Sequence, residues 1–210
     1  IQKEKFKIFK KIDLNLDGDS KENIASSTAI AIKKFAKFFK NNHFDLLIVL
    51  GDRYEIFGSV ISAYFLNIPI VHFHGGEITM GLIDEGIRHS ISKMSNYHLV
   101  STKKYRKRLI QLGENSNNIH VVGSLSLDNL RKIKFYTKKE TERILNFKFF
   151  DKNILFTYHP VTLENYNSKD QIKIILDVLA KYKDYGIIFT KSNSDSDNQI
   201  ISREIDRFVK

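Results

Sequence analysis

Cysteine is absent from the 210-residue sequence, and no apolar run approaches the length of a membrane span. Without cysteine the chain forms neither a disulfide scaffold, nor a cysteine-ligated zinc site, nor an iron–sulfur cluster. A membrane-spanning helix needs about 20 consecutive apolar residues. The first residues, IQKEKFKIFKK, alternate lysine with apolar residues and lack the continuous apolar centre of a signal peptide. These absences favour a soluble, cytoplasmic protein without a membrane partner.

Several motifs that bind common cofactors are also missing. The sequence contains no Walker lysine loop and no G-x-G-x-x-G, so a nucleoside triphosphatase or a dinucleotide-binding enzyme would lack its phosphate loop. It contains no H-E-x-x-H pattern, which would place two histidines and a glutamate at a zinc ion. We therefore expect no metal site and no cofactor.

The charge is strongly positive, at +10 with 34 basic and 24 acidic residues, but it is spread along the chain. The densest basic run is Lys103–Arg108, which includes Tyr105. A nucleic-acid surface needs a basic stripe interleaved with stacking aromatic residues. The alternative is the solvated face of an amphipathic helix, with Leu109 and Ile110 on its other side. We favour the helix and expect no nucleic-acid partner.

Short apolar runs alternate with helical patterns along most of the chain. Strands are predicted at 45–50, 68–73, 97–100, 119–122, 153–158 and 186–190, and residues 6–9 are also strand-like. Helices are predicted at 56–66, 83–94, 105–112, 138–145, 170–182 and 199–209. This order of strands and helices is typical of an α/β fold with a parallel, helix-covered sheet.

The pattern changes near Lys132, where a polar helical stretch precedes a new strand. We therefore predict a first domain over residues 1–133 and a second over 134–210. The second domain has only two predicted strands, too few for a stable sheet. We expect the start of the first domain and the remainder of the second to lie outside these residues.

Reactive side chains follow the predicted strands, where open parallel sheets bind their ligands. They are Asp52 and Arg53, then His74-Gly75-Gly76-Glu77, then Ser124 after Gly123, and finally His159. Asp52 is equally compatible with a helix N-cap, which favours aspartate. Two glycines let backbone N–H groups approach an anion or a sugar ring, although they also suit a tight turn without a ligand. We favour a ligand at the glycine turn.

Asp84, Glu85 and Arg88 open the helix predicted at 83–94. Acidic residues in a first turn commonly complement the helix dipole, and Asp84 can pair with Arg88 one turn later. The same spacing would bring an acid and a cation into one cleft. Several carboxylates in a cleft can divide into an acid and a base when their surroundings separate their pKa values.

The run Leu50–Asn115 closely resembles the hydrolysing UDP-N-acetylglucosamine 2-epimerases of bacterial sialic acid synthesis. The strings GDRYE, HGGE and DEGIRHSISKMS carry the resemblance, and it continues through Gly123-Ser124, Tyr158-His159-Pro160 and Thr190–Asn193. The resemblance implies a glycosyltransferase-B-like fold in which two Rossmann-like domains bind a UDP-sugar, and it suggests a homodimer or tetramer.

The resemblance also implies the chemistry. UDP is eliminated across C1–C2 to give a 2-acetamidoglycal, water then adds, and N-acetylmannosamine leaves with C2 inverted. Asp52, Glu77 and Asp84 are then the catalytic carboxylates, and Arg53, His74, Arg88, Ser124 and His159 bind substrate. One departure is that many relatives carry a glutamate where this chain has His74, so Glu77, His74 or Asp84 must take its role.

The resemblance leaves several alternatives open. The substrate is UDP-N-acetylglucosamine or the UDP-diacetamido sugar that leads to legionaminic acid. A non-hydrolysing 2-epimerase and a sugar-nucleotide-binding module without turnover are the other possibilities. The family's N-terminal glycine- and arginine-containing loop and its later Gly-Asn-Ser-Ser-Ser-Gly stretch are not among these residues. We therefore expect residues 1–210 alone to be inactive.

Overall fold

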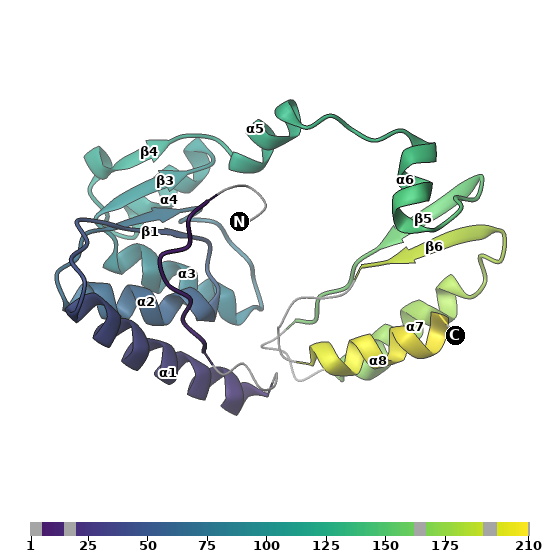
Figure 1. Cartoon of the computed structure of the whole chain (residues 1–210), viewed down its shortest axis with the longest axis horizontal. Helices are drawn as coiled ribbons and strands as arrows, with labels where there is room; N and C mark the ends of the chain where they lie inside the picture. Colours follow the sequence, from purple (N-terminus) through teal and green to yellow (C-terminus); the bar gives the residue numbers. More distant parts are fainter. Residues whose placement is uncertain (1–5, 15–19, 162–166, 191–196, 210) are drawn as a thin grey trace. The chain divides into compact units, whose positions relative to one another are not determined.

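The structure is a computed structural model that describes residues 6–14, 20–161, 167–190 and 197–209. It divides into two compact units, Ile1–Ser124 and Leu125–Lys210 (Figure 1). The sequence analysis places the division nine residues later, between residues 133 and 134. The difference concerns α5 (Leu125–Lys132), which is grouped with the second unit.

The first unit is built on a parallel sheet in the order β1-β2-β3-β4. Its strands are β1 (Leu47–Leu50), β2 (Ile70–Phe73), β3 (Tyr97–Val100) and β4 (Ile119–Val121). The helices are α1 (Lys21–Lys40), α2 (Tyr54–Phe65), α3 (Ile83–Met94) and α4 (Lys103–Gln111), followed by the short 3-10 helix Ser116–Asn118. Since all four strands are parallel, their carboxyl ends meet at one edge of the sheet.

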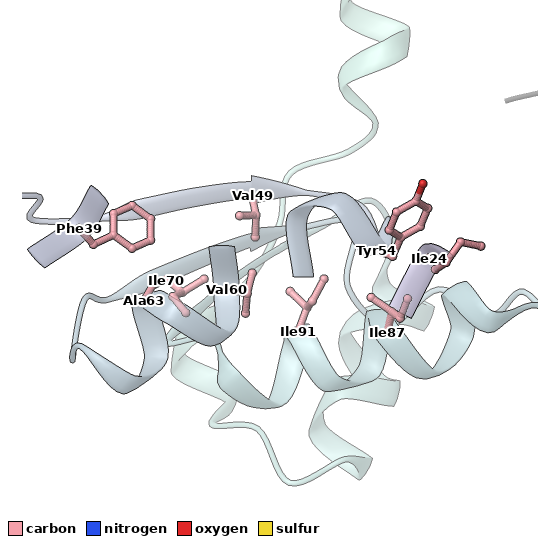
Figure 2. Packing of buried hydrophobic residues seen from close by; sticks show 9 residues of the cluster. All are labelled: Ile24, Phe39, Val49, Tyr54, Val60, Ala63, Ile70, Ile87 and Ile91. Atoms are coloured by element: carbon pink, nitrogen blue, oxygen red, sulfur yellow. The ribbon is translucent and has the colours of Figure 1, made fainter. Parts of the chain in front are cut away.

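The core of the first unit lies between the sheet and its helices (Figure 2). Ile70 from β2, Val60 and Ala63 from α2, and Ile91 from α3 are completely buried there. Helix α1 packs closely on α2, where Ser62 Oγ donates a hydrogen bond to the carbonyl of Ile32 at 2.9 Å. This packing holds the strand ends in fixed positions from which loops project.

The second unit contains a parallel pair, β5 (Lys152–Phe156) and β6 (Tyr185–Phe189). Its helices after α5 are α6 (Lys138–Leu145), α7 (Ser168–Leu179) and α8 (Asn198–Val209). Ile172 on α7 and Ile201 on α8 are fully buried at the centre of a separate apolar cluster. Each unit therefore has its own core.

The predicted elements agree with the structure along most of the chain, and the helix at 83–94 and the strand at 97–100 have the predicted bounds. The prediction of a strand at Phe6–Phe9 is wrong, because residues 6–14 have no regular secondary structure. Phe9 instead packs against Phe38 and Phe44, with ring centroids 6.1 and 6.4 Å away. Its apolar alternation therefore serves aromatic packing rather than strand pairing.

Helices α1 and α5 were not anticipated from the sequence. Within the described residues, no helix is both long enough and apolar enough to cross a membrane.

Candidate active site

Asp52 lies in the turn between β1 and α2, directly after Gly51. The N-cap residue of α2 is Arg53, so the alternative role of Asp52 as a helix cap is wrong. The Asp52 carboxylate instead forms an ion pair with Arg88 of α3, and 20% of its side chain remains exposed. Arg53 pairs with Glu55 through two hydrogen bonds of 3.1 and 2.9 Å. The turn therefore presents an acid held by a cation from another helix.

Arg88 is the centre of this arrangement, with a side chain that is only 6% exposed. Besides Asp52, its guanidinium donates to Thr79 Oγ1 at 2.7 Å and to Glu85 Oε2 at 3.3 Å. Glu85 Oε2 also accepts from the backbone N–H of Thr79 at 2.5 Å. Burial lowers the pKa of the Arg88 guanidinium from its ordinary value, although arginine has ample margin to stay charged. We call Asp52, Thr79, Glu85 and Arg88 the arginine cluster.

His74 and Glu77 form a second group at the same edge of the sheet, after β2. His74 Nδ1 lies 3.0 Å from Glu77 Oε1, and the same carboxylate oxygen accepts from Ser101 Oγ at 3.2 Å. Their side chains are 23% and 31% exposed, so both are accessible to a ligand. We call His74, Glu77 and Ser101 the histidine group. Thr79 lies two residues after Glu77, so the loop after β2 carries members of both groups.

Packing explains both glycines of the turn after β2. A Cβ at Gly75 would lie 2.8 Å from Ser92 Oγ and 3.0 Å from His72 Nδ1. Gly76 has φ +76°, and a Cβ there would lie 2.6 Å from the carbonyl oxygen of Tyr105. The close approach of α3 and α4 therefore accounts for both glycines without a ligand, which is the alternative that the sequence analysis did not favour. Arg108 also donates to the carbonyl of Gly76.

His72 lies beneath these turns and is completely buried. One ring nitrogen, Nε2, is 2.8 Å from the carbonyl oxygen of Gly51, and the other, Nδ1, is 3.1 Å from Ser92 Oγ. Burial lowers its pKa to about 4, so the ring is neutral near pH 7. A neutral imidazole donates at one nitrogen and accepts at the other, which fits a carbonyl on one side and a hydroxyl on the other.

The remaining predicted site residues lie in different places. Asp84 is half-buried in the first turn of α3, next to Glu85. Ser124 is half-buried at the end of the first unit, after Gly123 with φ +81°. His159 is exposed after β5 in the second unit. Lys191–Asn193, part of the resemblance, lie outside the described residues. The structure thus joins Asp52 to Arg88 and His74 to Glu77.

Two partners in these groups, Thr79 and Ser101, were not predicted as site residues, whereas Glu85 was named with Asp84 and Arg88 but was given no role of its own. Ser101 follows β3 directly, so the rule that ligands bind at strand ends would have indicated it. Glu85 lies three residues before Arg88, a spacing at which helical side chains meet. No sequence signal marks Thr79, because its contact with Arg88 depends on how the loop folds back.

The described residues contain no group of three or more histidine, cysteine, aspartate or glutamate side chains that could hold a metal ion. The two groups instead combine a carboxylate beside a fixed cation with a histidine beside a carboxylate. Such pairs suit proton transfer and the binding of an anionic group.

The amino-acid sequence matches the family described as UDP-N-acetylglucosamine 2-epimerase over residues 1–210. The chain belongs to this 2-epimerase family. It is 40% identical over 210 residues to the GDP/UDP-N,N'-diacetylbacillosamine 2-epimerase (hydrolyzing) of Campylobacter jejuni, covering 100% of this chain and 54% of that protein. It is 39% identical over 211 residues to the polysialic acid biosynthesis protein P7 of Escherichia coli, again covering 100% and 54%.

The chain spans about half the length of these curated 2-epimerase-family relatives. Among solved structures, it resembles the UDP-GlcNAc 2-epimerase of Methanocaldococcus jannaschii, crystallised in complex with UDP-GlcNAc and UDP. The TM-score is 0.72 at 19% identity, over 95% of this chain and 54% of the other. At that identity the likeness concerns the fold alone. It confirms the predicted class, an α/β, glycosyltransferase-B-like fold with parallel, Rossmann-like sheets.

Proposed function

We propose that the protein is a hydrolysing 2-epimerase that converts UDP-N-acetylglucosamine to N-acetylmannosamine and UDP. In the elimination step a base removes the C2 proton, the C2–H electrons form the C1–C2 double bond, and the C1–O bond breaks as UDP leaves. Water then adds to C1, and a proton returns to C2 from the opposite face. This chemistry needs a base, an acid and positive charge near the departing diphosphate.

The arginine cluster is the single observation that supports this proposal most directly. Its buried guanidinium holds Asp52 at the end of β1, where ligands of open parallel sheets bind. Because Arg88 fixes its position, Asp52 can exchange a proton with substrate without the cost of ordering a free side chain. Asp84 and Glu77 would supply the other carboxylates, and Arg53, His74, Ser124 and His159 would bind the UDP-sugar.

A second substrate is supported by a specific comparison. The Campylobacter relative is named as a hydrolysing epimerase of N,N'-diacetylbacillosamine nucleotides, and its identity to this chain is within one percentage point of that of the Escherichia coli protein. The UDP-diacetamido sugar that leads to legionaminic acid is therefore our alternative substrate. Both substrates share the 2-acetamido group and the diphosphate that the reaction uses.

Proton NMR of the protein expressed from its complete reading frame tests the function and separates the substrates. Incubation with each UDP-sugar in D₂O should give free 2-epimerised sugar, deuterated at C2, with one equivalent of UDP for the true substrate. A UDP-linked epimer without free sugar would contradict hydrolysis, and UDP-sugar binding without turnover would reduce the protein to a binding module.

The Asp52→Asn variant extends this test to the site. We expect it to fold and to lose deuterium incorporation at C2 by about 10²-fold or more, because the amide cannot exchange the proton that a carboxylate exchanges. A His43→Ala variant is the matched control, since His43 pairs with Asp45 on the surface and is 89% exposed. Unchanged turnover in the Asp52→Asn variant would show that Asp52 takes no part in the proton transfer.

A further inference from the structure

His74 and Glu77 are joined in a way that assigns them different roles. In a histidine–carboxylate pair, the carboxylate accepts the proton of one ring nitrogen and leaves the lone pair of the other available. Here the contact is made by His74 Nδ1, 3.0 Å from Glu77 Oε1. The neutral ring then carries its lone pair on Nε2, the atom farther from the carboxylate, which is the form of a base.

The carboxylate of Glu77 has two hydrogen-bonding partners, whereas this pair contacts His74 at one ring nitrogen. Glu77 Oε1 also accepts a hydrogen bond from Ser101 Oγ at the end of β3. The two residues between His74 and Glu77 are buried glycines that pack against α3 and α4. The carboxylate is therefore fixed relative to two neighbouring strands, and this suits a group that orients another side chain.

The backbone of His74 supports the same division of roles. Its φ is +64°, in the left-handed region that residues other than glycine seldom adopt, and its N–H donates to the carbonyl of Leu99 at 3.1 Å. Strained backbone of this kind is concentrated at functional sites, where the surrounding structure maintains it. The strained conformation places the imidazole at the strand end and against Glu77.

We infer that His74 is the base that takes the C2 proton of the UDP-sugar, and that Glu77 is a positioning residue that orients its ring. The inference rests on the proposed function, and it selects His74 from the three residues, Glu77, His74 and Asp84, that the sequence analysis left open for this role. In the step, His74 Nε2 gains the C2 proton, the C2–H electron pair forms the C1–C2 double bond, and the C1–O electron pair leaves with UDP. The resulting imidazolium is stabilised by the adjacent carboxylate.

The test compares four proteins expressed from the complete reading frame: wild type, His74→Ala, Glu77→Gln and the surface control His43→Ala. We expect His74→Ala to lose about 10²- to 10⁴-fold in kcat, the usual contribution of a general base. Added imidazole should restore a measurable part of that loss, and the rescued reaction should show a larger isotope effect with substrate deuterated at C2. The control should match wild type with and without imidazole.

Glu77→Gln should lower kcat by about tenfold with little change in KM, because the glutamine carbonyl still accepts from His74 but carries no charge. Turnover of His74→Ala close to wild type, or a folded His74→Ala that imidazole does not rescue, would overturn the inference. So would a Glu77→Gln loss that exceeds that of His74→Ala. A wild-type protein that releases no UDP would instead refute the proposed function, and the inference would fall with it.

Discussion

His72 shows how a single buried residue can connect the two turns of the site. Its ring contacts the carbonyl of Gly51, next to Asp52, and the hydroxyl of Ser92 on the helix that carries Arg88. A protonated ring would carry a positive charge without contact with water. Since the ring is completely buried, this explains in physical terms why burial lowers its pKa to about 4.

This pKa predicts how stability depends on pH. Between about pH 6.5 and pH 4, His72 binds a proton in the unfolded chain but stays neutral in the folded protein. The contribution of His72 to stability is therefore greatest above pH 6.5 and falls as the pH is lowered to 4. The free energy of unfolding should fall by about 3 kcal/mol over this range from His72 alone. Urea unfolding at pH 7.5 and pH 4.5 measures the change.

The His72→Gln variant is the control for this prediction. Glutamine can still donate to the Gly51 carbonyl but does not titrate, so the variant should lose most of this pH dependence. Burial also lowers the pKa of His98, which therefore leaves a smaller dependence of the same sign. A wild-type protein equally stable at both pH values, or a variant with an unchanged slope, would contradict the assignment.

At the scale of elements, the close packing of α1 on α2 depends on Gly58. A Cβ at this position would lie 2.5 Å from Ala31 Cβ and 2.9 Å from the backbone nitrogen of Ile32. Alanine forms helix better than glycine by about 1 kcal/mol, but overpacking commonly costs about 1 to 3 kcal/mol. Since these neighbours include backbone atoms, we expect the packing cost to prevail and Gly58→Ala to lower the unfolding free energy.

Gly86→Ala in α3 is the matched control for this substitution. Gly86 is exposed within a helix, and nothing lies within 4 Å of a Cβ built there. The same change should therefore raise the unfolding free energy by up to about 1 kcal/mol. Equal effects of the two substitutions in urea unfolding would show that helix propensity, and not the approach of α1, decides the outcome.

At the scale of the whole molecule, the net charge is +10, and the basic residues that produce it have different roles. Arg106 on α4 donates to the carbonyls of Ile119 and Ser116, and Arg108 donates to that of Gly76. These guanidinium groups fix loops of the first unit, whereas Lys103, Lys104 and Lys107 are exposed. The basic run therefore lies on a helix, as the sequence analysis predicted, and its two arginines contact the backbone of the first unit.

We accordingly predict only weak, non-specific binding to nucleic acid. Fluorescence anisotropy with a labelled single-stranded oligonucleotide should show affinity at 20 mM salt that falls steeply and is lost near 150 mM. A Lys103→Glu, Lys107→Glu double variant should weaken the low-salt binding further without changing the proposed turnover. Saturable binding that persists at 300 mM salt would contradict this prediction.

The sequence by itself determined the order of strands and helices from β1 to β4, because apolar periodicity is local and survives without knowledge of the fold. It also placed Asp52, His74 and Glu77 after strands, since a strand end is a local feature. Their position at one edge follows once the strands are parallel. The sequence analysis did not predict α1, although its N-cap Ser20 and its buried Ile24 and Ala31 are local features.

Only the tertiary structure decided which side chains meet. Arg88 and Asp52 are 36 residues apart, and no spacing rule connects residues on different elements. The same holds for Ser101 with Glu77, for Gly75 and Gly76 against α3 and α4, and for the burial that keeps His72 neutral. Each depends on the packing of helices on the sheet, which brings distant residues within hydrogen-bonding distance and removes water from between them.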